Sequence, residues 1–333
     1  MENVAASGVG IVGVGRCLPG KKLLNAQIEA QCNLPPGTIE EKTGVRERYV
    51  LTDEESSSTL AAAAARQALE HAGITPDQIG LIVCCAFTGD YVYPALACKV
   101  QEMLGAWNAG AFDLMANCTG FQVGLTVASD RMYADRNISN ALVIGVTAQS
   151  RFINWSDGDS AMYFGDGAGA AVLGRVPEGF GILANDIMSN GRVYEAVRLR
   201  GGGSSHPMRQ ENVDLGLQYF EVNGMEVWKQ VIQNQPKVMR RVLEKIGKGI
   251  EDVDFYIFHQ ANLKLIEFLM AKMKQPMEKT FTNVATIGNT SDASMAIALC
   301  DAVMAGAIKR DQLLIISGVG AGFTFGATAV RWY

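Results

Sequence analysis

The feature of this sequence that most restricts its fold is an internal repeat. A helical segment ends at Gly73 and leads through an acidic turn into the apolar run 81–83. The same succession returns 174 residues later, where Gly247 is followed by the apolar run 255–257. The repeat predicts two similar α/β halves, which we place at residues 1–175 and 176–333.

A second match extends the repeat into the loops that carry polar residues. The stretch from Cys118 to Asp130 parallels the stretch from Asn289 to Asp301, at an offset of 171 residues. In a duplicated fold, equivalent loop ends meet near a pseudo-twofold axis. We therefore expect Cys118 and Asn289 to face a common site, which His259 joins from the end of an apolar strand.

Apolar runs alternate with helical patterns along the chain, which predicts an α/β fold with strands buried on both faces. The predicted strands are 80–84, 141–145, 254–258 and 312–316, and an Ala-rich helix is expected over 60–72.

Composition excludes several classes of protein. Of 333 residues, 48% are hydrophobic and 19% are charged, which argues against a disordered chain or a coiled coil. The net charge of −5 argues against a nucleic-acid binder. No apolar run is long enough for a transmembrane helix, and residues 1–4 do not begin a signal peptide. Seven cysteines without a CxxC spacing make a disulfide framework or a metal site unexpected, so we expect a cytoplasmic protein.

Cys118 is the strongest candidate nucleophile. It stands between an apolar run and a helix whose Phe121, Leu125, Ala128 and Met132 share one face. Unpaired N–H groups at a helix start favour the thiolate, so we expect a lowered pKa for Cys118. The alternative is a small buried apolar residue, which is our interpretation of the other six cysteines.

Only three histidines are present, and they differ in setting. His259 follows an apolar strand and precedes a helix, where catalytic groups of α/β sheets concentrate. The competing interpretation is a structural core histidine. His71 falls in a helix that ends at Gly73, and His206 falls in a loop rich in Gly and Ser, so neither is expected to be catalytic.

Asn289 has two interpretations. An Asn before a helix is usually a cap, but the repeat makes it the counterpart of Cys118 and thus a candidate amide donor. The Gly-rich segment 318–323 after the last long strand suits an oxyanion hole or a tight turn. The segment Gly8–Gly13 fits GxGxxG but lacks a following helix, so a dinucleotide site is not favoured.

Several motifs occur together in one order and resemble the ketoacyl-acyl-carrier-protein synthase III family of the thiolase superfamily. They cover the chain from Gly10 to Arg331 and comprise Thr43–Arg48, the Phe112-Asp113…Cys118-Thr119-Gly120-Phe121 segment, Phe164–Ala170, His259–Asn262, Gly288–Ser291 and Gly322–Thr324. The resemblance implies an α/β thiolase fold, a five-layered αβαβα arrangement of two duplicated halves, and a homodimer in which Tyr93 reaches the partner's acyl pocket.

The same resemblance implies a mechanism without a cofactor. Cys118 attacks an acyl thioester, and backbone amides of Cys118 and of Gly320 and Ala321 hold the oxyanion. His259 and Asn289 donate hydrogen bonds to the carbonyl of a second thioester and stabilise its enolate, which attacks the acyl group on Cys118.

Departures from the family concern the substrate. Thr38 and Gly158 stand where members primed by coenzyme A have a Trp and an Arg that sandwich adenine, so we expect both substrates to arrive on acyl carrier proteins. Lys229, Lys264 and Lys272 match the family's docking face, although an ordinary solvated face is the competing interpretation. Asp292 and Met295-Ala296 replace apolar and Pro residues, which puts the shape of the acyl tunnel in question.

Several functions remain open. The first is a stand-alone ketosynthase of polyketide metabolism that joins two carrier-bound β-ketoacyl chains into an α-pyrone. The second is decarboxylative fatty-acid initiation with a malonyl unit. The third is acyl transfer to an alcohol or amine. The intact Cys118, His259 and Asn289 argue against a non-catalytic subunit, and the absence of a Cys at 318–325 argues against a thiolase proper.

Overall fold

The computed structural model describes residues 8–333, whose two large β-sheets have matching topology. The first has the order β1-β7-β6-β4-β5 and the second the order β11-β12-β13-β8. Their bounds are β1 Gly8–Cys17, β4 Leu81–Cys85, β5 Gly110–Leu114, β6 Ala141–Thr147, β7 Gly167–Val176, β8 Gly181–Ser189, β11 Phe255–Phe258, β12 Leu313–Gly320 and β13 Thr324–Arg331.

The two sheets repeat the same pairing. β4 and β6 are parallel, and β6, β7 and β1 follow antiparallel. β11 and β12 are likewise parallel, and β12, β13 and β8 follow antiparallel. The first sheet has one more strand, because β5 pairs with β4 where the second half has only an isolated bridge between Tyr256 and Thr280. The predicted boundary between residues 175 and 176 falls at the end of β7.

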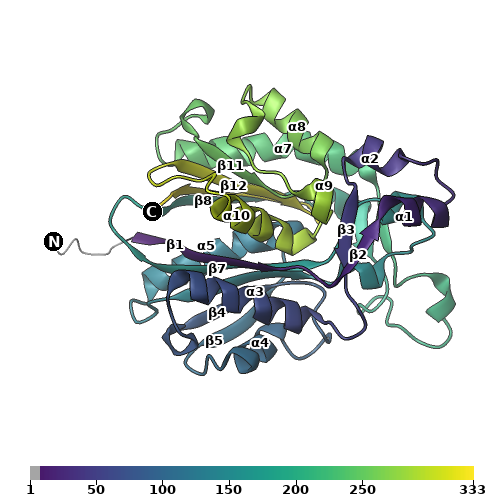
Figure 1. The fold of residues 1–333 in the computed structure, drawn as a ribbon, viewed down its shortest axis with the longest axis horizontal. Helices are drawn as coiled ribbons and strands as arrows, with labels where there is room; N and C mark the ends of the chain where they lie inside the picture. Colours follow the sequence, from purple (N-terminus) through teal and green to yellow (C-terminus); the bar gives the residue numbers. More distant parts are fainter. Residues whose placement is uncertain (1–7) are drawn as a thin grey trace.

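Helices and sheets alternate in five layers, αβαβα (Figure 1). α3 and α4 cover the outer face of the first sheet, α5 and α10 lie between the sheets, and α7 and α8 cover the outer face of the second. Their bounds are α3 Ser57–Ala72, α4 Leu96–Leu104, α5 Gly120–Ala134, α7 Gly224–Glu244, α8 Leu263–Lys272 and α10 Ser294–Met304.

A smaller group of elements lies beside the layers, at the right in Figure 1. It comprises β2 Lys21–Leu24, β3 Glu47–Val50, α1 Asn25–Gln31, α2 Thr38–Thr43 and α9 Val284–Ile287. The remaining short elements are α6 Gly158–Ala161, β9 Val197–Leu199 and β10 Phe220–Val222.

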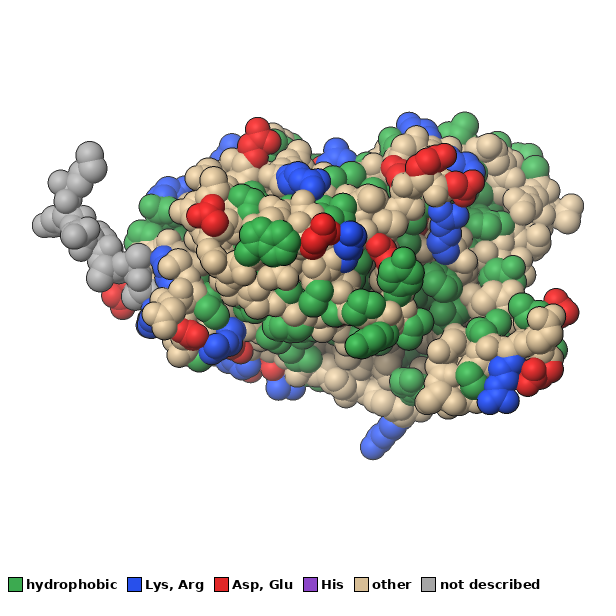
Figure 2. Space-filling view, turned by 90° about the horizontal axis from the view of Figure 1, so that it is seen from below, with side chains coloured by type: hydrophobic (Ala, Val, Ile, Leu, Met, Phe, Trp, Pro, Cys, Tyr) green, Lys and Arg blue, Asp and Glu red, His purple; other side chains and the backbone are tan. Residues whose placement is uncertain are grey.

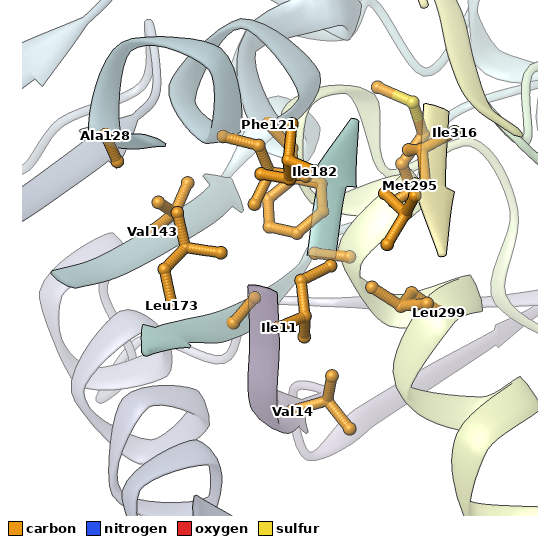
Figure 3. Close-up of a cluster of buried hydrophobic side chains, with 14 of the residues drawn as sticks. Ile11, Val14, Phe121, Ala128, Val143, Leu173, Ile182, Met295, Leu299 and Ile316 are labelled. Carbon is orange, nitrogen blue, oxygen red and sulfur yellow. The ribbon is translucent and has the colours of Figure 1, made fainter. Parts of the chain in front are cut away.

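The central layer holds a core that both halves share. Phe121 of α5 and Leu299 of α10 are fully buried, and they meet side chains of both sheets such as Val143 and Ile316 (Figure 3). The predicted face of α5 is confirmed, since Phe121, Leu125, Ala128 and Met132 have no exposed surface. A short turn at 117–119, which carries Cys118, leads into α5, and a similar turn at 291–293, which follows Asn289, leads into α10. We call these two turns the elbows. Because α5 and α10 share one core, the two elbows are held against each other.

The structure settles several further expectations. The predicted Ala-rich helix is α3, which ends at Gly73 in a left-handed conformation (φ 67°). Gly8–Gly13 lies entirely within β1, so it forms no dinucleotide loop. Residues 1–4, on which the expectation about a signal peptide rests, lie outside the described range. None of the helices in residues 8–333 has the length and apolarity to span a membrane.

Candidate active site

Cys118 lies in a single 3₁₀ turn, Asn117–Thr119, that runs directly into α5. The strand before it, β5, is at the edge of its sheet, and Phe112 on it is 39% exposed. Asn117 adopts a left-handed backbone (φ 50°), which turns the chain sharply before the helix. The predicted strand-turn-helix setting of Cys118 is therefore present.

The Gly-rich end of β12 packs against this turn. The side-chain amide of Asn117 donates to the carbonyl of Ala321 at 3.1 Å. A Cβ on Gly320 would stand 2.7 Å from the carbonyl oxygen of Ala116, so only glycine permits this approach. Gly320 and Ala321 therefore lie beside Cys118, as the oxyanion-hole prediction requires.

The second elbow lies against the first, as the repeat predicts. Ser291 follows Asn289 in a 3₁₀ turn that leads into α10, and its Oγ is 3.3 Å from Sγ of Cys118. The Asn289 side-chain oxygen accepts from the Ser291 backbone N–H at 2.9 Å. The oxygen of Asn289 thus caps the turn, as one interpretation expects, and among residues 8–333 its amide nitrogen donates to no acceptor.

His259 lies one residue beyond β11, where its backbone N–H donates to the carbonyl of Ser317. The imidazole is 8% exposed, and its Nδ1 is 2.5 Å from Oγ of Ser294. Ser294 Oγ accepts from the backbone N–H of Gln260. In the described part of the chain, Nδ1 of His259 is the one acceptor within reach of the hydroxyl hydrogen of Ser294. The hydroxyl therefore donates to Nδ1, and the ring proton resides on Nε2.

Burial lowers the pKa of His259 to about 3. The ring is consequently neutral near pH 7, and Nε2–H is a hydrogen-bond donor without a partner elsewhere in residues 8–333. The amide nitrogen of Asn289 is free in the same way. Two neutral donors thus border one cavity with the Cys118 thiol.

The expectation of a lowered pKa for Cys118 is wrong for this structure. Burial, and secondly the charge of Asp292, raise the pKa of the thiol to about 12, whereas the hydroxyl of Ser291 lowers it. Among residues 8–333, no Lys, Arg or charged His lines the cavity to offset the effect of burial on this pKa. The thiol therefore carries its proton near neutral pH in the free protein, and acylation must move that proton.

Asp292 is a fully buried carboxyl behind the nucleophile. Its Oδ2 is 3.5 Å from Oγ of Ser291, its Oδ1 has no hydrogen-bond partner in the described chain, and burial raises its pKa well above the ordinary value. A Cβ on Gly120 would meet Oδ1 at 2.3 Å. Asp292 thus fills the space against the start of α5 and does not line the cavity.

One cavity of about 150 Å³ collects the site residues from both halves. Cys118, His259 and Asn289 line it together with Gly320 and Ala321. Its remaining wall is mostly apolar and includes Phe87, Phe164, Phe220, Trp228, Val231, Leu265, Leu269 and Phe323. The arrangement offers a nucleophile, two carbonyl-directed donors and an apolar space.

The other predicted residues lie outside the cavity. Tyr93 is 88% exposed, Lys229 on α7 is near Glu226, and Lys264 on α8 is near Glu267. Lys272 lies at the last turn of α8 and donates to the carbonyl of Ile232. His71 and His206 are exposed and lie outside the cavity.

Sequence reasoning missed three polar residues of the site, namely Ser291, Ser294 and Gln149. The two serines stand in the elbow motif around Asn289, so the repeat was a signal for them. Gln149 follows β6 and has no sequence signal, because only packing places it on the cavity. Among residues 8–333, no cluster of His, Cys, Asp and Glu has a metal-binding arrangement.

Comparisons with known proteins agree with this geometry. Two family models match the chain, described as 3-oxoacyl-[acyl-carrier-protein] synthase III over residues 112–191 and as its C-terminal part over residues 243–332. The beta-ketoacyl-[acyl-carrier-protein] synthase III of Symbiobacterium thermophilum is 39% identical over 97% of this chain and 98% of its own length. That of Bacillus pumilus is 38% identical, with 97% and 98% covered.

Solved structures show the same architecture. The 3-oxoacyl-[acyl-carrier-protein] synthase III from Aquifex aeolicus has a TM-score of 0.89 and 35% identity, with 98% of this chain and 100% of that chain covered. The priming β-ketosynthase from the R1128 polyketide pathway has a TM-score of 0.90 and 29% identity, with 100% and 98% covered.

These similarities extend over the full fold and place the chain among the thiolase-fold ketosynthases, acyltransferases that carry out Claisen condensations. Within that class, it belongs to the β-ketoacyl-[acyl-carrier-protein] synthase III family.

Proposed function

We propose that this chain condenses an acyl group held on Cys118 with a malonyl unit carried by an acyl carrier protein, with loss of carbon dioxide. The observation that carries the proposal is the single cavity on which Cys118, His259 and Asn289 meet. From the sequence alone, the joining of two β-ketoacyl chains was the first candidate. The names of the relatives favour the initiation reaction instead.

In the first half-reaction, Sγ of Cys118 attacks the thioester carbonyl and the carrier thiol leaves. The Cys118 proton passes to that leaving thiol, so no net proton is gained or lost. Backbone amides of Cys118 and of the 320–321 segment stabilise the tetrahedral oxyanion. Loss of one such donor typically costs about 3–4 kcal/mol of barrier.

In the second half-reaction, the malonyl thioester carbonyl accepts hydrogen bonds from Nε2 of His259 and the amide of Asn289. Cleavage of the bond to the carboxylate releases carbon dioxide and leaves the electron pair on an enolate. The enolate carbon attacks the acyl carbonyl, the bond to Sγ breaks, and Cys118 leaves as a thiolate that takes a proton from solvent water. A neutral His259 suits this step because decarboxylation requires a hydrogen-bond donor and no base.

The joining of two carrier-bound β-ketoacyl chains is a second candidate. The Thr38 hydroxyl donates to the carbonyl of Pro35, and a Cβ on Gly158 would stand 3.2 Å from the side chain of Leu34. Neither residue offers a plane for an adenine ring, which supports carriers as the source of both chains. Mass spectrometry after incubation with two β-ketoacyl carriers distinguishes the candidates, because a pyrone forms only in the second.

Carrier docking beside the cavity follows from the same proposal. Lys229 and Lys264 are exposed near the starts of α7 and α8, next to the cavity residues Trp228 and Leu265. Acyl carrier proteins are acidic, so these lysines suit their surface. Lys272 fits less well, because its ammonium already bonds to a carbonyl.

A homodimer is part of the proposal. Tyr91, Val92 and Tyr93 are 76%, 99% and 88% exposed, and Phe112 and Met115 on and after the edge strand β5 are exposed as well. Figure 2 shows apolar side chains gathered across the middle of the face on which α4 lies. A second copy that covers this surface would bring Tyr93 toward its neighbour's cavity. Sedimentation of the purified chain tests the dimer.

The central test is the intact mass of the protein after incubation with acyl carrier thioesters. We expect an acyl adduct on the native protein and none on Cys118→Ala. A native protein that stays unmodified would remove the acyl-enzyme proposal altogether.

A further inference from the structure

We propose that Gln149 recognises an oxygen substituent on the acyl group held by Cys118, so that the acyl donors are 3-oxoacyl or 3-hydroxyacyl thioesters and not plain acyl chains. The inference rests on the proposed acylation of Cys118 and adds to it the class of acyl substrate.

Gln149 is an unpaired amide inside the cavity. It is 3% exposed and lines the same cavity as Cys118. Among residues 8–333, its Oε1 is buried without a hydrogen-bond partner. Buried side-chain amides are nearly always hydrogen-bonded, so this one calls for a ligand atom.

The backbone on both sides of Gln149 is fixed. The N–H of Ala148 donates to Oγ1 of Thr88 at 2.8 Å, and the N–H of Ser150 donates to Oδ1 of Asp166 at 2.9 Å. These anchors hold the short 3₁₀ turn 149–152 that carries the amide. The site is therefore built before the substrate arrives, which is what selectivity requires.

The rest of the cavity narrows the choice of ligand group. Phe87, Phe164 and Phe220 make most of the nearby wall apolar, and no Lys or Arg lines it, so a charged acyl substituent would find no counter-charge. The side-chain amide of Gln149 has an acceptor atom, Oε1, and a donor atom, Nε2, and either atom can bond to an uncharged oxygen substituent. A carbonyl accepts from Nε2–H, and a hydroxyl or enol donates to Oε1. A plain acyl chain satisfies neither atom.

The hydroxyl of Tyr93 from a second copy is the competing partner for this amide, because Tyr93 is exposed in the single chain. In that case Gln149 would be structural in the dimer, and Tyr93→Phe would destabilise the protein as much as Gln149→Leu does.

The first experiment is a competition for Cys118 in which a 3-hydroxyacyl carrier and a 3-oxoacyl carrier are each set against the plain acyl carrier of equal chain length, with adducts quantified by intact mass. We expect the native protein to favour at least one of the two oxygenated groups by about tenfold or more and Gln149→Leu to lose that preference. An unchanged ratio in the variant overturns the inference alone. No adduct of either kind on the native protein overturns the proposed function and this inference with it.

The second experiment measures the melting temperature without substrate. Because leucine removes an unpaired buried amide, Gln149→Leu should melt no lower than the native protein. The matched control is Gln122→Leu, which deletes an amide that donates to Thr328 at 2.8 Å and should melt lower. A fall in Gln149→Leu equal to that of the control, or matched by Tyr93→Phe, assigns Gln149 a structural partner and refutes the inference.

Discussion

Ser294→Ala tests whether a buried hydroxyl sets the tautomer of His259. Ser294 is 1% exposed and bridges two groups, Nδ1 of His259 at 2.5 Å and the backbone N–H of Gln260 at 3.2 Å. Alanine leaves both groups unpaired in the interior, and each unpaired buried group costs about 1–3 kcal/mol. Since the two share one environment, we expect a loss of about 2–3 kcal/mol in the free energy of unfolding.

The effect on chemistry is confined to the second half-reaction. Without the hydroxyl, part of the imidazole population carries its proton on Nδ1 and offers no donor to the malonyl carbonyl. Outright removal of such a donor typically lowers a rate about 10²–10³-fold. Because some rings keep Nε2–H, we expect condensation to fall by about 10- to 100-fold.

The assay measures the two half-reactions separately. Intact mass follows acylation of Cys118, and the yield of 3-oxoacyl carrier follows condensation. Ser294→Thr keeps a hydroxyl and is the matched control, in which condensation should recover. A folded Ser294→Ala protein that condenses at the native rate, or that loses acylation to the same degree, would refute the tautomer argument.

Three further predictions concern other parts of the site. Gly120→Ala should lower the melting temperature and the rate of Cys118 acylation, because the new Cβ would stand 2.3 Å from Oδ1 of Asp292. The matched control is Gly191→Ala, whose new Cβ has no atom of the described residues within 4 Å and which should leave both quantities unchanged. Burial lowers the pKa of His259 from 6.5 to about 3, so between these pH values only the unfolded chain binds a proton at this residue. Urea denaturation should therefore show the free energy of unfolding decreasing as the pH drops from 6.5 toward 3. The decrease should be less steep in His259→Gln. Lys264→Glu should weaken binding of an acyl carrier protein, most strongly at low salt. The control variant Lys309→Glu should bind the carrier as the native protein does. Calorimetry that finds the same affinity for both variants would contradict docking at the start of α8.

Much of the fold was predictable because it depends on patterns that recur along the chain. Apolar runs marked β4, β6, β11 and β12 to within a few residues, and the repeat predicted two similar α/β halves. The edge strand β5 was less evident, since Phe112 and its neighbours remain partly exposed in the single chain. A strand whose side chains stay partly exposed lacks the continuous apolar run that marks a buried strand.

The sequence predicted that Cys118, His259 and Asn289 would meet, and they line one cavity, but the electrostatics around them were not predicted. The position of Cys118 before a helix suggested a lowered pKa, yet burial and the nearby Asp292 raise it. Desolvation depends on every atom around the thiol, and those atoms come from distant segments of the chain.

The sequence by itself determined the duplicated architecture and the two elbows, because local periodicity and a constant offset between Cys118 and Asn289 are properties of the chain alone. Only the tertiary structure decided what surrounds them. It placed Ser291 against the thiol, set Ser294 behind the imidazole and turned Gln149 into the cavity. The physical reason is that hydrogen-bond partners and burial arise from contacts between segments far apart in sequence, and these contacts exist only once the two halves share a core.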